Sequence, residues 1–186
     1  MVENVSPAQT WEALKSDPQA QLVDVRTQPE WDFTGVPDLG AAGKQAVLIP
    51  WQVYPAMQVN ARFADHLKEA GFTPEHHIFF ICRTGGRSAA AAQAAQQAGF
   101  PHAFNVADGF EGPPDGAGHR GTLAGWKASG LPWRQKESRG AGCVGLPRSA
   151  GEVATRCAAG EGATAPGTLT RFASRTDLSR RAGEVK

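Results

Sequence analysis

The sequence predicts an open α/β fold, in which a parallel sheet is flanked by helices on both faces. Short apolar stretches alternate with segments of helical spacing along the first two thirds of the chain. The apolar stretches also lack the polar alternation that antiparallel sheets with one solvated face usually show. A chain of 186 residues, 41% of them hydrophobic, can build one ordinary core but is short for two full domains. One α/β domain is therefore expected.

Three helices are indicated by capping and spacing signals. The first follows Ser6, a good N-cap residue, and opens with Pro7. The second lies within residues 60–72, where apolar side chains recur at helical spacing. The third spans residues 88–98, which are nearly all Ala and Gln and are closed by Gly99.

Four apolar stretches are predicted to be strands. They are residues 21–26 (QLVDVR), 46–51 (AVLIPW), 77–82 (HIFFIC) and 102–106 (HAFNV). The third is almost entirely apolar, which is typical of a parallel strand that is buried on both faces. The strands alternate with the predicted helices, so parallel pairing through helical crossovers is expected.

The composition changes near residue 135. Residues 136–186 show no sustained periodicity, are rich in Gly, Ala and Arg, and carry an excess of positive charge, whereas the preceding part carries an excess of negative charge. Their few apolar side chains cannot offset an ordering entropy of about 1–2 kcal/mol per residue. We therefore expect a domain over residues 1–135 and a disordered Gly/Ala/Arg-rich tail over residues 136–186.

The overall charge and the cysteines exclude several classes of protein. A net charge of +1 argues against a nucleic-acid or membrane partner, and no apolar run approaches the roughly 18 residues needed to span a bilayer. The three cysteines, Cys82, Cys143 and Cys157, show no CxxC spacing, which argues against a disulfide framework or a zinc site. A cytoplasmic protein without metal or cofactor is expected.

Cys82 is the candidate for chemistry because of where it lies. It ends a predicted strand just before a helix, and ligands of open α/β sheets bind beyond the carboxyl ends of the strands. Gly85 and Gly86 allow the backbone to curl so that several N–H groups surround an anion. A helix N-terminus stabilises a nearby negative charge by about 0.5–2 kcal/mol. The pattern favours a largely ionised, nucleophilic sulfur over the alternative of a small buried hydrophobic residue.

Residues 82–88, CRTGGRS, resemble the active-site loop of single-domain rhodanese-like sulfurtransferases. Residues 22–31 (LVDVRTQPEW) and 108–133 (DGFEG, GW and GLPW in order) are similar to the N- and C-terminal motifs of that family. The resemblance covers roughly residues 6–134. It implies a rhodanese-like fold and a persulfide mechanism, in which Cys82 takes a sulfane sulfur from thiosulfate or a persulfide and passes it to a thiophilic acceptor.

The loop residues then have expected roles. The predicted anion-binding set is Arg83, Thr84, Gly85, Gly86, Arg87 and Ser88. Arg83 and Arg87 would bind an oxyanionic donor, although Arg87 could instead tether the loop to a neighbouring carboxylate. Ser88 is expected to cap the Ala-rich helix. Asp24 and Arg26 match the family motif and are expected to form an ion pair that supports the loop rather than to take part in catalysis.

Some side chains outside the loop leave alternatives open. Trp51 and Tyr54 could line the pocket or pack in the core, and His119 and Arg120 could reach the site or belong to a surface loop. The segment 34–51 is longer than the matching family stretch and lacks its histidine, so the rim of the pocket is expected to differ.

Other functions also have to be considered. A non-catalytic rhodanese-like binding or regulatory module is one alternative, although such modules often lack the cysteine that this chain retains. A cysteine-dependent phosphatase or arsenate reductase is another, but four residues separate Cys82 from Arg87 where phosphatases have five. The shorter loop suits one sulfur better than a tetrahedral phosphate. The expected partners are a small sulfur donor and a thiol or cyanide acceptor, or a sulfur-relay protein.

Overall fold

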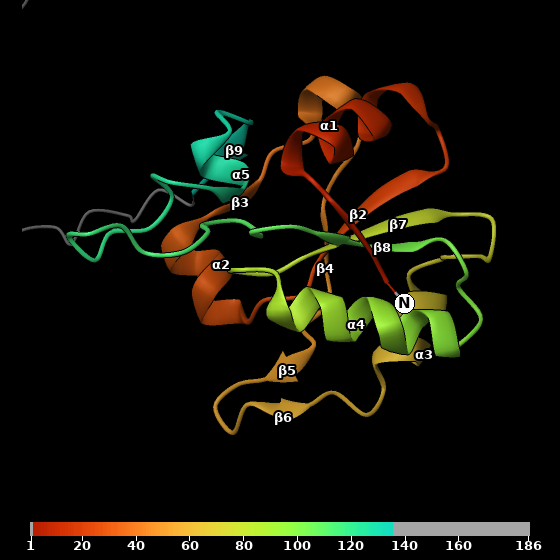
Figure 1. Cartoon of the computed structure of the whole chain (residues 1–186). Coiled ribbons are helices and arrows are strands. Elements are labelled where there is room, and N and C mark those ends of the chain that lie inside the picture. The colour runs from red at the N-terminus through yellow and green to blue at the C-terminus, as the bar shows by residue number, and fades with distance from the viewer. Residues whose placement is uncertain (1, 136–186) are drawn as a thin grey trace, which may run out of the picture. The chain divides into compact units, whose positions relative to one another are not determined.

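A computed structural model of the chain describes residues 2–135 and contains a central five-stranded sheet (Figure 1). All neighbouring strands are parallel, in the order β1-β8-β7-β2-β4. The strands are β1 (Glu3–Val5), β2 (Ala20–Asp24), β4 (Val47–Leu48), β7 (His77–Ile81) and β8 (Ala103–Val106). The predicted open parallel sheet is thereby confirmed. The tail predicted for residues 136–186 lies outside the described residues.

Helices cover both faces of this sheet, as the sequence predicts. They are α1 (Pro7–Ser16), α2 (Gln28–Thr34), α3 (Phe63–Glu69), α4 (Gly86–Gln97), α5 (Gly125–Ala128) and the 3-10 helix η1 (Gly40–Ala42). Helices α3 and α4 pack on one face, and α1 and α5 pack on the other (Figure 1). None of the helices in the described part of the chain is long and apolar enough to cross a membrane.

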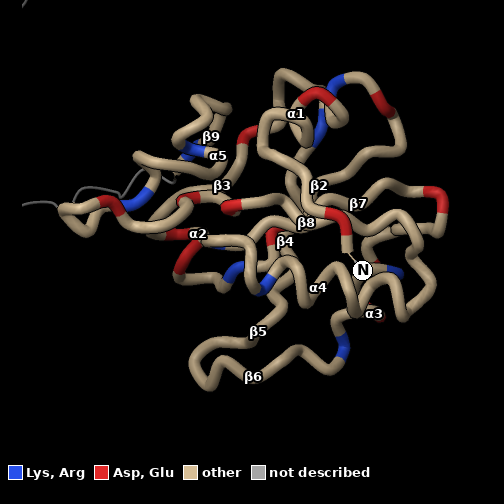
Figure 2. The backbone as a smooth tube through the Cα atoms, in the orientation of Figure 1, with Lys and Arg blue, Asp and Glu red and all other residues tan. Residues whose placement is uncertain are grey.

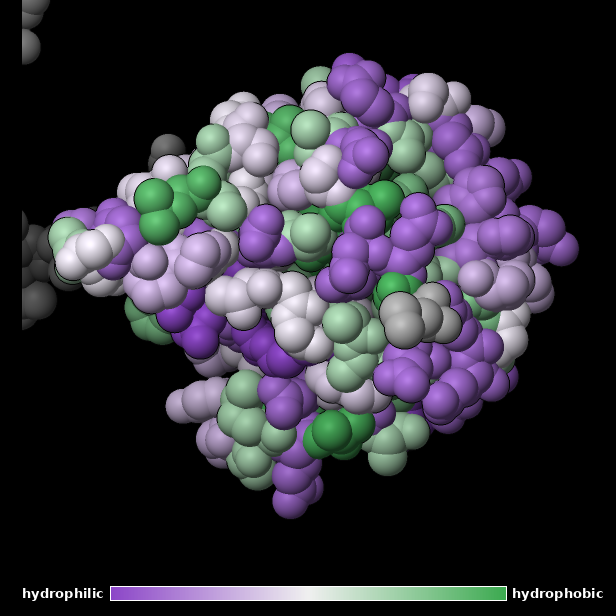
Figure 3. Space-filling view, in the orientation of Figure 1, coloured by the Kyte–Doolittle hydropathy of each residue, from purple (hydrophilic) through white to green (hydrophobic). Residues whose placement is uncertain are grey.

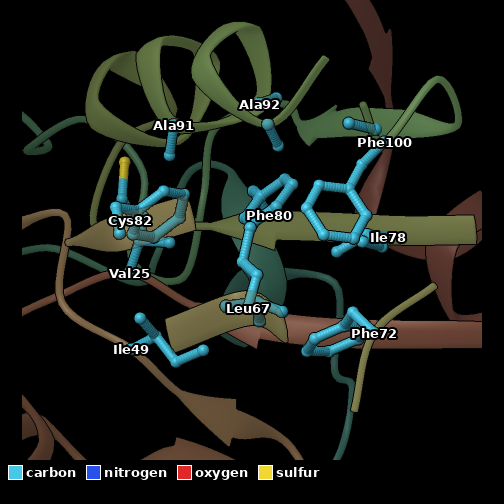
Figure 4. Close-up of a cluster of buried hydrophobic side chains, with 14 residues drawn as sticks. Val25, Ile49, Leu67, Phe72, Ile78, Phe80, Cys82, Ala91, Ala92 and Phe100 are labelled. Atoms are coloured by element: carbon cyan, nitrogen blue, oxygen red, sulfur yellow. The ribbon is translucent and has the colours of Figure 1, made fainter. Parts of the chain in front are cut away.

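Strand β7 is buried on both faces because it lies at the centre of the sheet. Ile78 and Phe80 face α3 and α4, whereas Phe79 and Ile81 belong to the core beneath α1 and α5. Figure 4 shows the small alanine side chains of α4 above Phe80 and Cys82. Because these side chains are short, the helix packs close to the sheet and holds its first turn directly over the end of β7.

Several short elements were not predicted from the sequence. Strand β1 is only three residues long and mostly exposed at the sheet edge, so it lacks an apolar pattern. Two antiparallel ribbons join β3 (Val36–Pro37) to β9 (Trp133–Arg134) and β5 (Gln52–Val53) to β6 (Gln58–Val59). Two-residue strands are too short to produce a recognisable alternation.

The second predicted strand, over residues 46–51, is shorter than expected. Within this stretch only Val47 and Leu48 form β4, and Pro50 has no N–H group that could continue the hydrogen bonding of the strand. The chain still runs beside β2, since the N–H of Ile49 donates to the carbonyl of Asp24 and that of Trp51 to the carbonyl of Val25.

A turn at residues 109–112 holds the base of the cysteine loop. The N–H of Phe110 donates to the carbonyl of Cys82 at 2.7 Å, and the N–H of Glu111 donates to that of Arg83 at 3.0 Å. Gly109 has φ of +61°, and a Cβ atom there would lie 2.3 Å from the carbonyl oxygen of Cys82. Only glycine therefore fits at this position.

Replacing Gly109 by alanine should lower the free energy of unfolding by about 2–4 kcal/mol, because the new Cβ requires both a left-handed backbone and displacement of the Cys82 carbonyl. Urea denaturation measures the change. Gly116→Ala is the matched control, since no atom lies within 4 Å of the added Cβ. Equal stability of the two variants would contradict the assigned role of the turn.

Candidate functional site

Cys82 lies directly beyond the end of β7 and before α4, and the residue is only 1% exposed. In Figure 4 its sulfur atom points toward α4. The N–H of Gly85 donates to Sγ at 3.1 Å, and Oγ of Ser88 lies 3.2 Å from the same sulfur. The Gly85 N–H thus donates to the sulfur, and the Ser88 hydroxyl lies within hydrogen-bonding distance of the same atom.

The loop reaches this geometry through a left-handed glycine. Gly85 is the N-cap of α4 and has φ of +97°, which turns its N–H back over the sulfur. The helix begins at Gly86, two residues earlier than the sequence suggests.

Ser88 is therefore not the helix cap, and that prediction was wrong. Its side chain is buried in the first turn of α4 rather than before it. Its hydroxyl oxygen lies 3.2 Å from the sulfur of Cys82 and 3.0 Å from the carbonyl oxygen of Gly85. Since a hydroxyl has one proton, it donates to one of these two acceptors at a time.

Arg87 is tied to a carboxylate on α2. Its Nη1 and Nη2 atoms donate to Oε2 and Oε1 of Glu30 at 2.8 and 2.6 Å. Figure 2 shows blue segments at the start of α4 beside red segments of α2. Of the two roles considered for Arg87, binding an anionic donor or holding the loop to a neighbouring carboxylate, the structure shows the second. Arg83 is exposed, and its side chain forms no hydrogen bond or ion pair with any residue that the structure describes.

Sequence reasoning did not identify Glu30 as the partner of Arg87, although a local signal was present. Thr27 and Glu30 are three residues apart at the start of α2, the spacing of a capping box. Oε2 of Glu30 accepts hydrogen bonds from both the N–H and the hydroxyl of Thr27. The same carboxylate therefore fixes the start of α2 and the cysteine loop.

The pKa of Glu30 is lowered from 4.5 to about 2. Burial is the largest single influence and raises it, but the hydrogen bonds from Arg87 and Thr27 together with the charge of Arg87 outweigh burial. The pKa of Arg87 is raised, chiefly by its hydrogen bonds to Glu30. Both groups remain charged at neutral pH.

Asp24 and Arg26 form a fully buried ion pair, as expected. Nε and Nη2 of Arg26 donate to the two carboxylate oxygens of Asp24, and the remaining donors reach Oγ1 of Thr34 at 2.7 Å and the carbonyl of Gly35 at 2.8 Å. The guanidinium also lies 4.1 Å from the centre of the Phe110 ring. The pair joins β2, the end of α2 and the supporting turn of the loop.

A pocket of about 530 Å³ opens over the loop. Its walls include Glu30 from α2, Tyr54 and Met57 from the connection between β5 and β6, and Arg83, Thr84 and Arg87 from the loop. Tyr54 thus lines the pocket, whereas Trp51 packs edge-on against Phe63 with ring centres 5.1 Å apart. Within residues 2–135, no group of three or more His, Cys, Asp or Glu side chains could hold a metal ion.

His119 and Arg120 belong to a surface loop and do not line this pocket. The backbone of His119 is hydrogen-bonded to Asp115, and Nη1 of Arg120 donates to the carbonyl of Gly112.

Comparison with known proteins agrees with this architecture. The family profile described as "STR4 middle domain" matches residues 2–139. A rice protein named "THYLAKOID RHODANESE-LIKE, chloroplastic" is 31% identical over 162 residues, which make up 81% of this chain and 30% of the rice protein. The chain belongs to the rhodanese-like family.

Two other relatives match about three quarters of the chain over nearly their own whole length. The crystal structure of Rv0390 from M. tuberculosis is 44% identical, with a TM-score of 0.66, and the match covers 72% of this chain and 98% of that protein. The uncharacterized protein RC0915 of Rickettsia conorii is 34% identical over 134 residues, again 72% of this chain and 98% of the relative. The predicted family and fold are thereby confirmed.

Replacing Glu30 by glutamine should destabilise the protein in a pH-dependent way. Because the folded pKa of Glu30 is depressed, its stabilising contribution is complete above pH 4.5 and is lost as the pH falls toward about 2. At neutral pH we expect a loss of about 1–3 kcal/mol in the free energy of unfolding. The difference from the parent chain should shrink over that acid window when unfolding is followed by circular dichroism.

The control for this experiment is Glu12→Gln, because the Glu12 side chain is 70% exposed and its ion pair within residues 2–135 is with the neighbouring Lys15. Its effect should stay near zero throughout. A loss for Glu30→Gln that does not change with pH would contradict the assigned ion pair.

Proposed function

We propose that this protein is a sulfurtransferase that carries a sulfane sulfur as a persulfide on Cys82. The observation that carries the proposal is the convergence of the Gly85 N–H and the Ser88 hydroxyl on Sγ of Cys82, at the end of the central strand and beside the first turn of α4. Hydrogen-bond donors aimed at a sulfur support its anionic form, which is the nucleophile.

In the first step the Cys82 thiolate attacks the sulfane sulfur of the donor. With thiosulfate, a new bond forms between Sγ and the outer sulfur, the bond from that sulfur to the sulfonate breaks, and sulfite leaves with the electron pair. Arg83 is the cation placed to attract the anionic donor, because Arg87 is engaged by Glu30. The persulfide then carries the negative charge on its outer sulfur.

In the second step a thiophilic acceptor attacks that outer sulfur. The sulfur–sulfur bond of the persulfide breaks, and its electron pair returns to Sγ of Cys82, which regenerates the thiolate. Cyanide becomes thiocyanate, and a thiolate becomes a persulfide. Backbone N–H groups of the loop from Arg83 to Ser88 hold the outer sulfur between the two steps. Asp24 and Arg26 act through the position of the loop and not on the substrate.

Replacing Cys82 by serine should abolish sulfur transfer and leave the fold intact, since a hydroxyl fills the same space but is a poor sulfur carrier. The parent chain incubated with thiosulfate should gain the mass of one sulfur atom in intact-protein mass spectrometry. The variant should gain none and should produce no thiocyanate when cyanide is added. Retention of substantial thiocyanate production would refute the proposed mechanism.

Residues 1–135 should suffice for this activity, because Cys82, its loop and the pocket over the loop all lie within residues 2–135. A chain that ends at Gln135 should therefore keep the thermal midpoint and the rate of thiocyanate formation of the full chain. Changing both Cys143 and Cys157 to serine in the full chain provides the control. A slower reaction in either form would assign the remaining residues a part in sulfur transfer.

A further inference from the structure

One exposed apolar surface beside the pocket is not used by the proposed chemistry. Residues 52–59, called here the rim hairpin, comprise β5, β6 and the turn between them. Four large apolar or aromatic side chains in this hairpin are substantially exposed: Val53 (48%), Tyr54 (61%), Met57 (40%) and Val59 (56%). Exposed apolar clusters of this kind mark interaction sites, and Tyr and Met are favoured in interfaces.

The register of the rim hairpin divides these side chains between two faces. Gln52 pairs with Val59, and Val53 pairs with Gln58, so Val59 lies on the face of Gln52 and Val53 lies on the opposite face. Gln52, Tyr54 and Met57 line the pocket over the cysteine loop. Val59 therefore extends the pocket-facing surface outward, whereas Val53 faces away from it.

The base of the rim hairpin is fixed to the domain. The N–H of Trp51 donates to the carbonyl of Val25, the N–H of Asn60 donates to the carbonyl of Trp51 at 2.8 Å, and Nδ2 of Asn60 donates to the carbonyl of Pro50 at 3.0 Å. Figure 1 shows the hairpin extending from the sheet below α2 and α4. A surface anchored in this way is preorganised to receive a partner.

The pocket also has one cationic side chain, Arg83, that is not neutralised by a described carboxylate. The rim hairpin contains no charged residue, whereas Arg83 lines the same pocket, is exposed, and is not paired within residues 2–135. In Figure 3 the strongest purple lies between α2 and α4, directly above green atoms over the hairpin. A ligand that complements both the rim hairpin and Arg83 carries an apolar side chain on one side of its reacting group and a carboxylate on the other side.

We propose that the rim hairpin docks the sulfur acceptor, and that this acceptor is a cysteine in a protein segment with an apolar neighbour and an acidic neighbour; the proposal rests on the proposed sulfurtransferase function. Cys82 is almost fully buried and the pocket opens over the loop residues that follow it, so an acceptor thiol approaches the sulfur through the pocket. The apolar neighbour packs on Tyr54, Met57 and Val59, and the carboxylate pairs with Arg83. The acceptor thiolate then takes the outer sulfur, and the electron pair of the broken bond returns to Cys82.

The test uses the full chain loaded with persulfide by thiosulfate, and follows discharge of the sulfur to three acceptors. They are cyanide, a short peptide in which Leu and Asp flank the cysteine, and the same peptide with Gly at both flanking positions. The Leu/Asp peptide should react faster than the Gly peptide. Val59→Ser should lower kcat/KM for the Leu/Asp peptide by about fivefold or more while leaving discharge to cyanide unchanged.

Val53→Ser is the matched control, since Val53 is similarly exposed but lies on the opposite face of the same hairpin. It should leave the rates with all three acceptors unchanged. The docking proposal is overturned if the Leu/Asp and Gly peptides react equally, if the two serine variants behave alike, or if Val59→Ser slows the discharge to cyanide.

Other outcomes distinguish failure of the docking proposal from failure of the proposed function. If sedimentation shows a dimer of the parent chain that Val59→Ser dissociates, a second copy of the chain occupies the hairpin and the acceptor proposal is wrong. If no persulfide forms on Cys82, the proposed sulfurtransferase function is wrong, and the docking proposal that rests on it is overturned as well. Formation of the persulfide and its discharge to cyanide, without a preference among peptides, overturns the docking proposal alone.

Discussion

The buried Asp24–Arg26 pair constrains the whole region around the cysteine. Two fully buried charges are tolerated only when their hydrogen-bonding groups are satisfied, because desolvation of each ion costs several kcal/mol. Arg26 meets this demand by binding Asp24, Thr34 and Gly35, and by stacking over Phe110. The contacts that satisfy the Arg26 guanidinium therefore hold together the end of β2, the end of α2 and the turn that supports the loop.

Two sets of contacts connect the Asp24–Arg26 pair to the cysteine loop. One runs through α2, whose end is held by Arg26 and whose first turn presents Glu30 to Arg87. The other runs through Phe110, whose N–H binds the carbonyl of Cys82. The loop is thus held at its base and at the start of α4, while the pocket remains open between α2 and the rim hairpin.

The two arginines of the loop differ in what they can do. Arg87 is neutralised by a bidentate carboxylate, so it contributes rigidity rather than attraction for an anion. Arg83 keeps an exposed charge at the pocket wall, opposite an apolar hairpin. This asymmetry agrees with the proposed roles, in which the loop holds the sulfur, Arg83 attracts an anionic donor, and the rim hairpin binds the acceptor.

The sequence by itself determined the fold class, the central strand β7 and the loop at its end. An almost entirely apolar stretch before a double glycine and an Ala-rich helix leaves few alternatives, because each signal is local. The Asp24–Arg26 pair was also predicted, through the resemblance of residues 22–31 to the N-terminal motif of the family. Only the tertiary structure decided that Arg87 binds Glu30, 57 residues away, and that Ser88 lies within α4 facing the sulfur. It also decided the edge strand β1 and the rim hairpin, because pairing between distant segments, and not their own composition, stabilises them.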